Sequence, residues 1–371
     1  MSSKFLSKVR NVVIRIVFQV FLIIVLLEVI LRIYNPIQGS VQGDKILLHA
    51  NQTLEVRNDQ VFPDMPAKWT VSTNSLGFRG TEPPKNWNKS FKVITVGGST
   101  TFCVAVDDSL TWSYRLERTL KEVFPEIWIN NAGLQGHSTH GHKILLEDHV
   151  LRLKPDIILF LIGVNDTWML PEFGIGTVQK KIKFWLYKSE LVKTFIGVIR
   201  VYKGKKFHAI TESGATYNIT KLDKNIIPED EATRLLDQYS VDLEAYATRL
   251  TDLINICRNS DVVPIIMTQP LLFGKTSDPT TNIDLYTIDL PYSEMNSGLF
   301  SEVLDDINER TRLVCNATNT SLIDLAVMLP KDSKYYLDGM HYTPLGNQKI
   351  VDLIYPELKQ YMLEIKKSKF N

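Results

Sequence analysis

Short apolar runs alternate with amphipathic segments along the chain from residue 91 onward. Five runs rich in Val, Ile, Leu and Phe predict strands, at 91–96, 127–130, 156–162, 262–267 and 321–325. Apolar residues at helical spacing predict helices between them, at 111–123, 142–153, 230–259 and 299–315, and a last helix beginning near residue 346. Strands that are apolar on both faces indicate a buried parallel sheet. With right-handed crossovers, we expect an α/β protein: a three-layer α/β/α sandwich around a five-stranded parallel sheet.

The amino terminus carries a much longer apolar stretch. Residues 16–31 are apolar except for Gln19 and Glu28, and residues 12–31 are enough to cross a bilayer. Basic residues precede the stretch, at Lys4, Lys8, Arg10 and Arg15, so we expect a single membrane-spanning helix with its amino terminus in the cytoplasm. A cleaved signal peptide is less favoured, because no small-x-small cleavage site follows Leu31. The basic flank also argues against a buried core helix.

These patterns predict the domain organisation. We expect a cytoplasmic tail and anchor over 1–34, an extracytoplasmic lead-in broken by prolines over 35–90, and an α/β domain over 91–371. An insertion at about 168–229 interrupts the alternation of predicted strands and helices. Its middle part, 180–206, holds nine Lys or Arg residues and one Glu, a net charge of +8 (9 − 1), with apolar residues interleaved. Such a segment suits a membrane surface or an anionic substrate; a lid or surface helix with solvated lysines is the alternative.

The composition limits which binding partners, metals and cofactors we expect. The 371 residues carry a net charge of +1, which gives no reason to expect nucleic acid as a partner. Cys103, Cys257 and Cys315 lack Cys-x-x-Cys spacing, which argues against a disulfide framework or a structural zinc site. Histidines at 137, 140, 142 and 149 raise a metal alternative, but no carboxylate or cysteine is placed to complete a ligand set. We therefore expect neither metal nor cofactor, and nothing in the sequence indicates an oligomeric state.

Three candidate catalytic residues each follow the end of a predicted strand. Ser99 follows the first, Gly136 the second and Asn165 the third, and the carboxyl ends of parallel strands meet at one edge of a sheet. A serine hydroxyl needs a neighbouring base to act as a nucleophile, and histidine suits that role near neutral pH. Asp338 and His341 are three residues apart, so one loop can supply an imidazole and the carboxylate that orients it.

Attack by a serine on an acyl group creates an oxyanion that needs hydrogen-bond donors. The backbone N–H groups of Ser99 and Gly136 and the side-chain amide of Asn165 are the candidates. Taken singly, each feature has a structural explanation: a βα turn at 97–99, a helix cap at 163–166, a structural Asp-x-x-His pair at 338–341. Their order along the βα alternation favours the joint, catalytic interpretation.

The chain resembles the SGNH (GDSL-like) hydrolase superfamily over about residues 70–360. Gly97-Gly98-Ser99-Thr100 stands in place of the Gly-Asp-Ser block, as in a membrane-anchored Gly-Gly-Ser-Thr branch. Three further blocks match: Asn-Ala-x-x-x-Gly-x-Ser at 131–138, Gly-x-Asn-Asp at 163–166 and Asp-x-x-His at 338–341. The segment Thr73 to Gly80 also resembles the lead-in of anchored members. Two departures stand out: Gly98 replaces an Asp, and Cys103 stands where this branch often has Gly.

The resemblance implies a flavodoxin-like sheet order and a serine esterase, with Ser99, Asp338 and His341 as catalytic residues and Ser99, Gly136 and Asn165 forming the oxyanion hole. It also implies acyl esters, such as O-acetyl groups, on an extracytoplasmic glycan or lipid. Two alternatives stay open at this point: an O-acyltransferase using the same residues, and a non-catalytic envelope scaffold that binds through the basic segment 180–206.

Overall fold

The computed structural model describes residues 3–33, 41–42, 45–58, 65–168, 189–192, 194–195, 218–291 and 293–370. Most of the basic segment 180–206 lies outside these residues. The chain forms two compact units. The smaller unit joins Met1–Leu47 with Phe173–Phe207, and the larger unit joins Leu48–Glu172 with His208–Asn371.

A five-stranded, wholly parallel sheet forms the centre of the larger unit, in the order β6-β5-β7-β8-β9. Its strands are β5 (Phe91–Gly97), β6 (Ile127–Asn131), β7 (Ile157–Leu161), β8 (Val263–Met267) and β9 (Ser321–Ile323). Every residue of β6 and β7 is buried, as the continuously apolar runs predicted. β5 lies between β6 and β7, so the strand order reverses at β5. In open α/β sheets, ligands bind at the carboxyl ends of the strands beside such a switch point.

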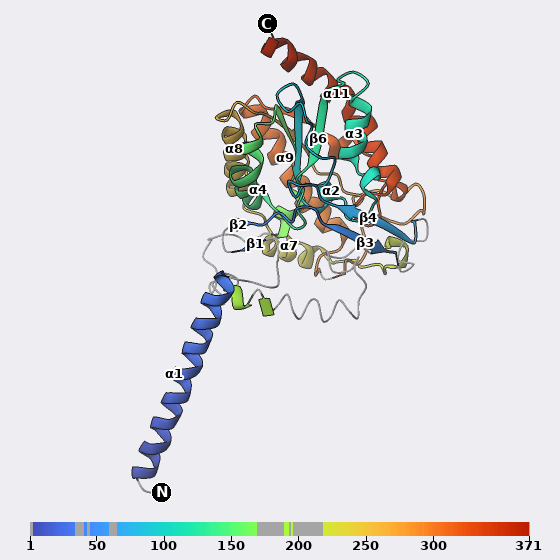
Figure 1. The fold of residues 1–371 in the computed structure, drawn as a ribbon. Helices are drawn as coiled ribbons and strands as arrows, with labels where there is room; N and C mark the ends of the chain where they lie inside the picture. The colour runs from blue at the N-terminus through green and yellow to red at the C-terminus, as the bar shows by residue number, and fades with distance from the viewer. Residues whose placement is uncertain are drawn as a thin grey trace. The chain divides into compact units, whose positions relative to one another are not determined.

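Helices cover both faces of the sheet, which confirms the three-layer α/β/α prediction. In Figure 1, α3 and α11 lie on one side, and α4, α8 and α9 on the other. The helices of this unit are α2 (Ser99–Phe102), α3 (Trp112–Leu120), α4 (Thr139–Leu145), α7 (Glu229–Gln238), α8 (Leu243–Arg258), α9 (Ser297–Ala317), α10 (Leu325–Met328) and α11 (Pro344–Phe370). Short 3₁₀ or π turns are η1 (Asp108–Leu110), η2 (Leu146–Val150), η3 (Leu151–Leu153), η4 (Val164–Trp168), η6 (Ile219–Lys221) and η7 (Ser333–Tyr335).

Two expectations about secondary structure were wrong. The single helix expected over 230–259 is two helices, α7 and α8, because Asp242 leaves the helical conformation and accepts a hydrogen bond from the Ala245 N–H at 2.9 Å as the N-cap of α8. The lead-in expected to be irregular contains an antiparallel pair, β3 (Thr53–Arg57) with β4 (Lys68–Ser72). The buried side chains of Val56, Trp69 and Val71 explain the pair, since they give one face of it a core to pack against.

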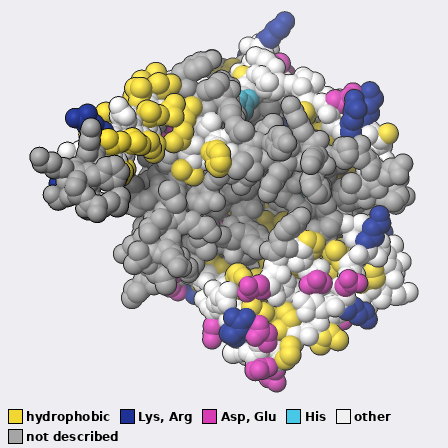
Figure 2. Space-filling view, turned by 90° about the horizontal axis from the view of Figure 1, so that it is seen from below, with side chains coloured by type: hydrophobic (Ala, Val, Ile, Leu, Met, Phe, Trp, Pro, Cys, Tyr) yellow, Lys and Arg dark blue, Asp and Glu magenta, His cyan; other side chains and the backbone are white. Residues whose placement is uncertain are grey.

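The smaller unit contains α1 (Ser3–Ile33) and the strand pair β1 (Val41–Gln42) and β2 (Lys45–Ile46). Among the described residues, one helical stretch, Arg10–Ile33, is long and apolar enough to cross a membrane. Most of the exposed large hydrophobic side chains in the described part of the chain lie on it. Figure 2 shows a dense group of apolar side chains at the upper left of the view, and others scattered among charged side chains at the lower right.

Candidate active site

Ser99 lies at the start of α2, directly after β5 and the Gly97-Gly98 turn. Its Oγ is 2.8 Å from Nε2 of His341, and Nδ1 of His341 is 2.7 Å from Oδ2 of Asp338. All three side chains are buried, Ser99 at 7% exposure. With Nδ1–H donating a hydrogen bond to the carboxylate, the unprotonated Nε2 can accept the serine proton. Residues more than 200 positions apart thus form one hydrogen-bonded series.

The loop that carries Asp338 and His341 is held by its own hydrogen bonds. Oδ1 of Asp338 accepts the backbone N–H groups of Met340 at 2.7 Å and His341 at 2.8 Å. The Leu337 N–H donates to the His341 carbonyl at 2.7 Å, which closes the turn. The carboxylate and the imidazole are therefore fixed relative to each other before any substrate arrives.

The protonation of His341 depends on two opposing influences. Burial lowers its pKa, while the charge and the hydrogen bond of Asp338 raise it, and the net result is a pKa above the usual value. Asp338 therefore makes the buried imidazole a better proton acceptor than burial alone would allow.

Asn165 lies beside the serine turn. Its Nδ2 donates to the His137 carbonyl at 2.9 Å, which uses one of the two N–H bonds of the amide. A Cβ placed on Gly98 would lie 2.1 Å from that same Nδ2. The missing side chain at position 98 is thus what allows the amide to approach the residue before Ser99.

Gly136 lies in the loop between β6 and α4, with φ of +71° in the left-handed region that favours glycine. The Leu134 N–H donates to the Gly97 carbonyl at 3.0 Å, and the His137 N–H donates to the Leu134 carbonyl at 3.2 Å. These bonds tie the loop to the end of β5. The structure therefore brings the loops of Gly136 and Asn165 to the same sheet edge as Ser99.

A family model described as the GDSL-like lipase/acylhydrolase family matches residues 94–349, well over half of the chain. The chain belongs to this family. Among solved structures, the acetylxylan esterase Axe2 from Geobacillus stearothermophilus is 16% identical, with a TM-score of 0.42 over 72% of this chain and 93% of that chain. A lipase/acylhydrolase from Enterococcus faecalis is 17% identical, with a TM-score of 0.41 over 73% of this chain and 96% of that chain. No curated protein matches the sequence.

A buried ion pair fixes the Asn165 loop of the GDSL-like domain against α4. Asp166 accepts the Thr139 hydroxyl at 2.6 Å and the Thr139 N–H at 3.2 Å, and Arg249 of α8 lies 3.4 Å from its carboxylate. Burial raises the pKa of Asp166, while Thr139 and Arg249 oppose that rise. Asp166 stands in the quoted Gly-x-Asn-Asp block, but nothing in the sequence around Arg249 pointed to it, because its partners are distant along the chain.

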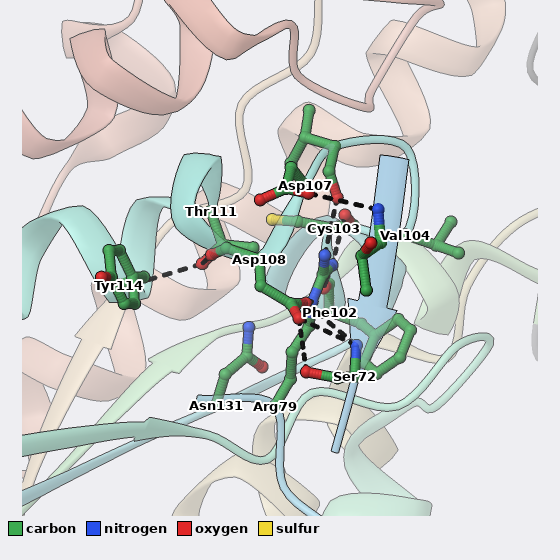
Figure 3. A network of polar contacts seen from close by, with 12 residues as sticks. Ser72, Arg79, Phe102, Cys103, Val104, Asp107, Asp108, Thr111, Tyr114 and Asn131 are labelled. Carbon is green, nitrogen blue, oxygen red and sulfur yellow. Dashed lines mark hydrogen bonds and ion pairs between the residues drawn. The ribbon is translucent and has the colours of Figure 1, made fainter. Parts of the chain in front are cut away.

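Arg79, in the Thr73–Gly80 segment, holds the chain just after α2 (Figure 3). Its guanidinium donates at 2.6 Å to each of three carbonyls, those of Phe102, Cys103 and Val106, and pairs with Asp108 at 2.7 Å. The side chain is 1% exposed. Five donors in a planar fork explain why arginine serves here. The lead-in segment is therefore packed into the GDSL-like domain next to the serine helix.

Cys103 and the histidines after β6 have separate environments. Burial raises the pKa of the Cys103 thiol to about 12, so it is a neutral, buried group despite lying close to Ser99 in sequence. Burial lowers the pKa of His137 to about 4, and that of His142 to about 3, the latter with help from His137. Among the described residues, no cluster of three or more potential metal ligands occurs.

Proposed function

We propose that this member of the GDSL-like family is a membrane-anchored serine esterase. The hydrogen-bonded series Ser99–His341–Asp338 is the observation that carries this proposal. Ser99 Oγ attacks the ester carbonyl while Nε2 of His341 takes its proton. Collapse of the tetrahedral intermediate expels the alcohol, which takes that proton. Water then attacks the acyl-enzyme, again through His341, and releases the carboxylic acid and the free serine.

The oxyanion hole in this proposal combines the N–H groups of Ser99 and Gly136 with the amide of Asn165. The short approach of Nδ2 to position 98 supports the role of Asn165. The left-handed turn at Gly136, tied to the end of β5 through Leu134, supports the second donor. Such donors stabilise the charge that develops on the attacked carbonyl oxygen.

We further propose that α1 anchors the protein with its amino terminus in the cytoplasm and the GDSL-like domain outside it. The basic residues before the apolar stretch support this orientation. The substrates are then acyl esters, with O-acetyl groups on an extracytoplasmic glycan or lipid as the first to test. Protease added to intact cells is expected to degrade the domain and spare the amino-terminal tail; protection of the domain would contradict the orientation.

The activity is tested with the purified full chain in detergent and an activated acetyl ester, with and without a glycan acceptor. Release of acetate that is lost in Ser99→Ala supports the esterase. An acylated glycan formed at the expense of acetate would replace hydrolysis by transfer. Undiminished turnover in Ser99→Ala would overturn both.

A further inference from the structure

Glu28 is an ionisable residue inside the apolar helix α1, and such a residue in a membrane-spanning segment needs partners. Arg32, one turn later, supplies the first partner, since its guanidinium lies 2.8 Å from Oε1. The carboxylate keeps further acceptor capacity, because its two oxygens offer about four lone-pair sites.

The remaining partners of Glu28 come from residues 189–192, here named the docked turn, in the insertion between β7 and α7. The Ser189 hydroxyl donates to Oε2 at 2.7 Å. The backbone N–H of Glu190 donates to Oε1 at 3.0 Å, and that of Leu191 to Oε2 at 3.1 Å. The Ser189 side chain in turn accepts the Val192 N–H at 3.3 Å. Segments more than 160 residues apart therefore meet at one carboxylate.

These bonds account for the groups that a helix start leaves unsatisfied. Residues 190–192 are helical, and their first N–H groups have no partner within the helix. Glu28 accepts two of them and Ser189 accepts the third, so the docked turn is completed by a side chain of the anchor. Glu190 itself is buried.

We propose that Glu28 is a docking point on the membrane helix for the insertion, and that the docked turn rests on the lipid surface there. The proposal depends on the membrane anchoring given above. Glu28 lies near the end of the membrane-length stretch Arg10–Ile33 that leads into the rest of the chain. Phe195, just beyond the docked turn, is 64% exposed.

Charge and apolar side chains argue for lipid as the partner of this surface. Lys188 and Lys193 flank the docked turn in the sequence, and the 180–206 segment around it carries a net charge of +8 (9 − 1). Basic residues interleaved with apolar ones in the sequence suit the headgroup region of a bilayer that contains anionic lipid. The exposed Phe195 ring would then lie against acyl chains rather than water.

Disulfide cross-linking tests the docking itself. The full chain carrying Val25→Cys, one helical turn before Glu28, and Val192→Cys keeps the Glu28 carboxylate and the Ser189 hydroxyl in place. In nanodiscs that contain phosphatidylglycerol, it is oxidised and then cleaved between the two positions. The fragments are expected to stay joined until reduced. The matched control pairs Gln19→Cys with Val192→Cys, because Gln19 is the other polar residue of the apolar stretch. Equal cross-linking of both pairs would overturn the docking point; the native cysteines are buried and serve as an internal background.

A spin label at Phe195→Cys tests the lipid contact in the same nanodiscs. Collisions with oxygen are expected to exceed collisions with a water-soluble nickel complex, and Glu28→Leu is expected to reverse that order while Gln19→Leu does not. A label that is exposed to water in the chain with Glu28 intact would overturn the lipid contact. Hydrolysis of a soluble acetyl ester should be unchanged in Glu28→Leu, so failure here is distinguishable from failure of the esterase proposal.

Discussion

Two histidines reach the end of β5 from different loops, and their surroundings differ. His341 has a carboxylate partner, and its pKa lies above the usual value. The Nδ1 atom of His137 is buried with no hydrogen-bond partner among the described residues, and burial lowers the pKa of this ring to about 4. His137 contributes its carbonyl instead, which accepts the Asn165 amide. The Asp338 carboxylate therefore favours a protonated ring at His341, whereas burial disfavours one at His137.

Replacing each histidine by alanine should separate the two residues by their effect on kcat. His341→Ala removes the proton acceptor of Ser99 and should lower kcat by on the order of 10⁶-fold. His137→Ala keeps the backbone carbonyl that holds Asn165, so kcat should fall by less than about tenfold, within the range of a small positioning change. Steady-state hydrolysis of an acetyl ester measures both. Similar losses in the two variants would erase the distinction.

The carboxylate partner is tested by Asp338→Asn. The amide no longer fixes the tautomer of His341, so kcat should fall by about 10⁴-fold. The pH profile should change as well. Neutral His341 is the active form, so kcat/KM rises with pH through a pKa above 6.5, and loss of the carboxylate charge should move that rise to lower pH. An unshifted profile would show that Asp338 does not set the basicity of the imidazole.

The role of the Asn165 amide, which donates to the His137 carbonyl, is tested by two substitutions. Asn165→Ala should lower kcat by on the order of 10²–10³-fold, as expected for one oxyanion donor. Gly98→Ala pushes a Cβ to 2.1 Å from Nδ2 of Asn165, so the amide must move. A displacement near 1 Å should cost up to about 10²-fold in kcat. The double variant should be no worse than Asn165→Ala alone, and fully additive losses would contradict the shared cause.

Stability against acid is expected to show the smallest effect. The folded-state pKa values of His137 and His142 lie below the unfolded value, so the unfolded chain binds more protons between pH 6.5 and about 4. Stability should therefore fall as the pH drops through that window. Chemical denaturation at several pH values should give a shallower fall for His137→Phe than for the parent chain. An identical slope would mean that His137 is not buried as a neutral ring.

Much of the architecture followed from local pattern. The runs at β5 and β7 are mostly apolar, which predicts buried parallel strands. The loops that follow them carry Ser99 and Asn165 within short sequence blocks of the family. The β3–β4 pair was missed because it depends on contacts that are distant along the chain, such as the Ser72 N–H donating to Asp108, which local sequence does not display.

The supporting contacts of the site were harder to foresee. Arg79 reaches carbonyls 23–27 residues away, and Arg249 reaches Asp166 across 83 residues. Side-chain pairs of this kind depend on the assembled fold, whereas Asp338 and His341 are close enough in the chain to be paired by spacing alone.

Covalent labelling with a fluorophosphonate shows whether Ser99 is a nucleophile activated by His341. We expect one modified residue, Ser99, identified by peptide mass spectrometry, with labelling lost in Ser99→Ala, strongly slowed in His341→Ala and little changed in His137→Ala. Equal labelling of all four proteins, or a label on another residue, would contradict a serine activated by His341.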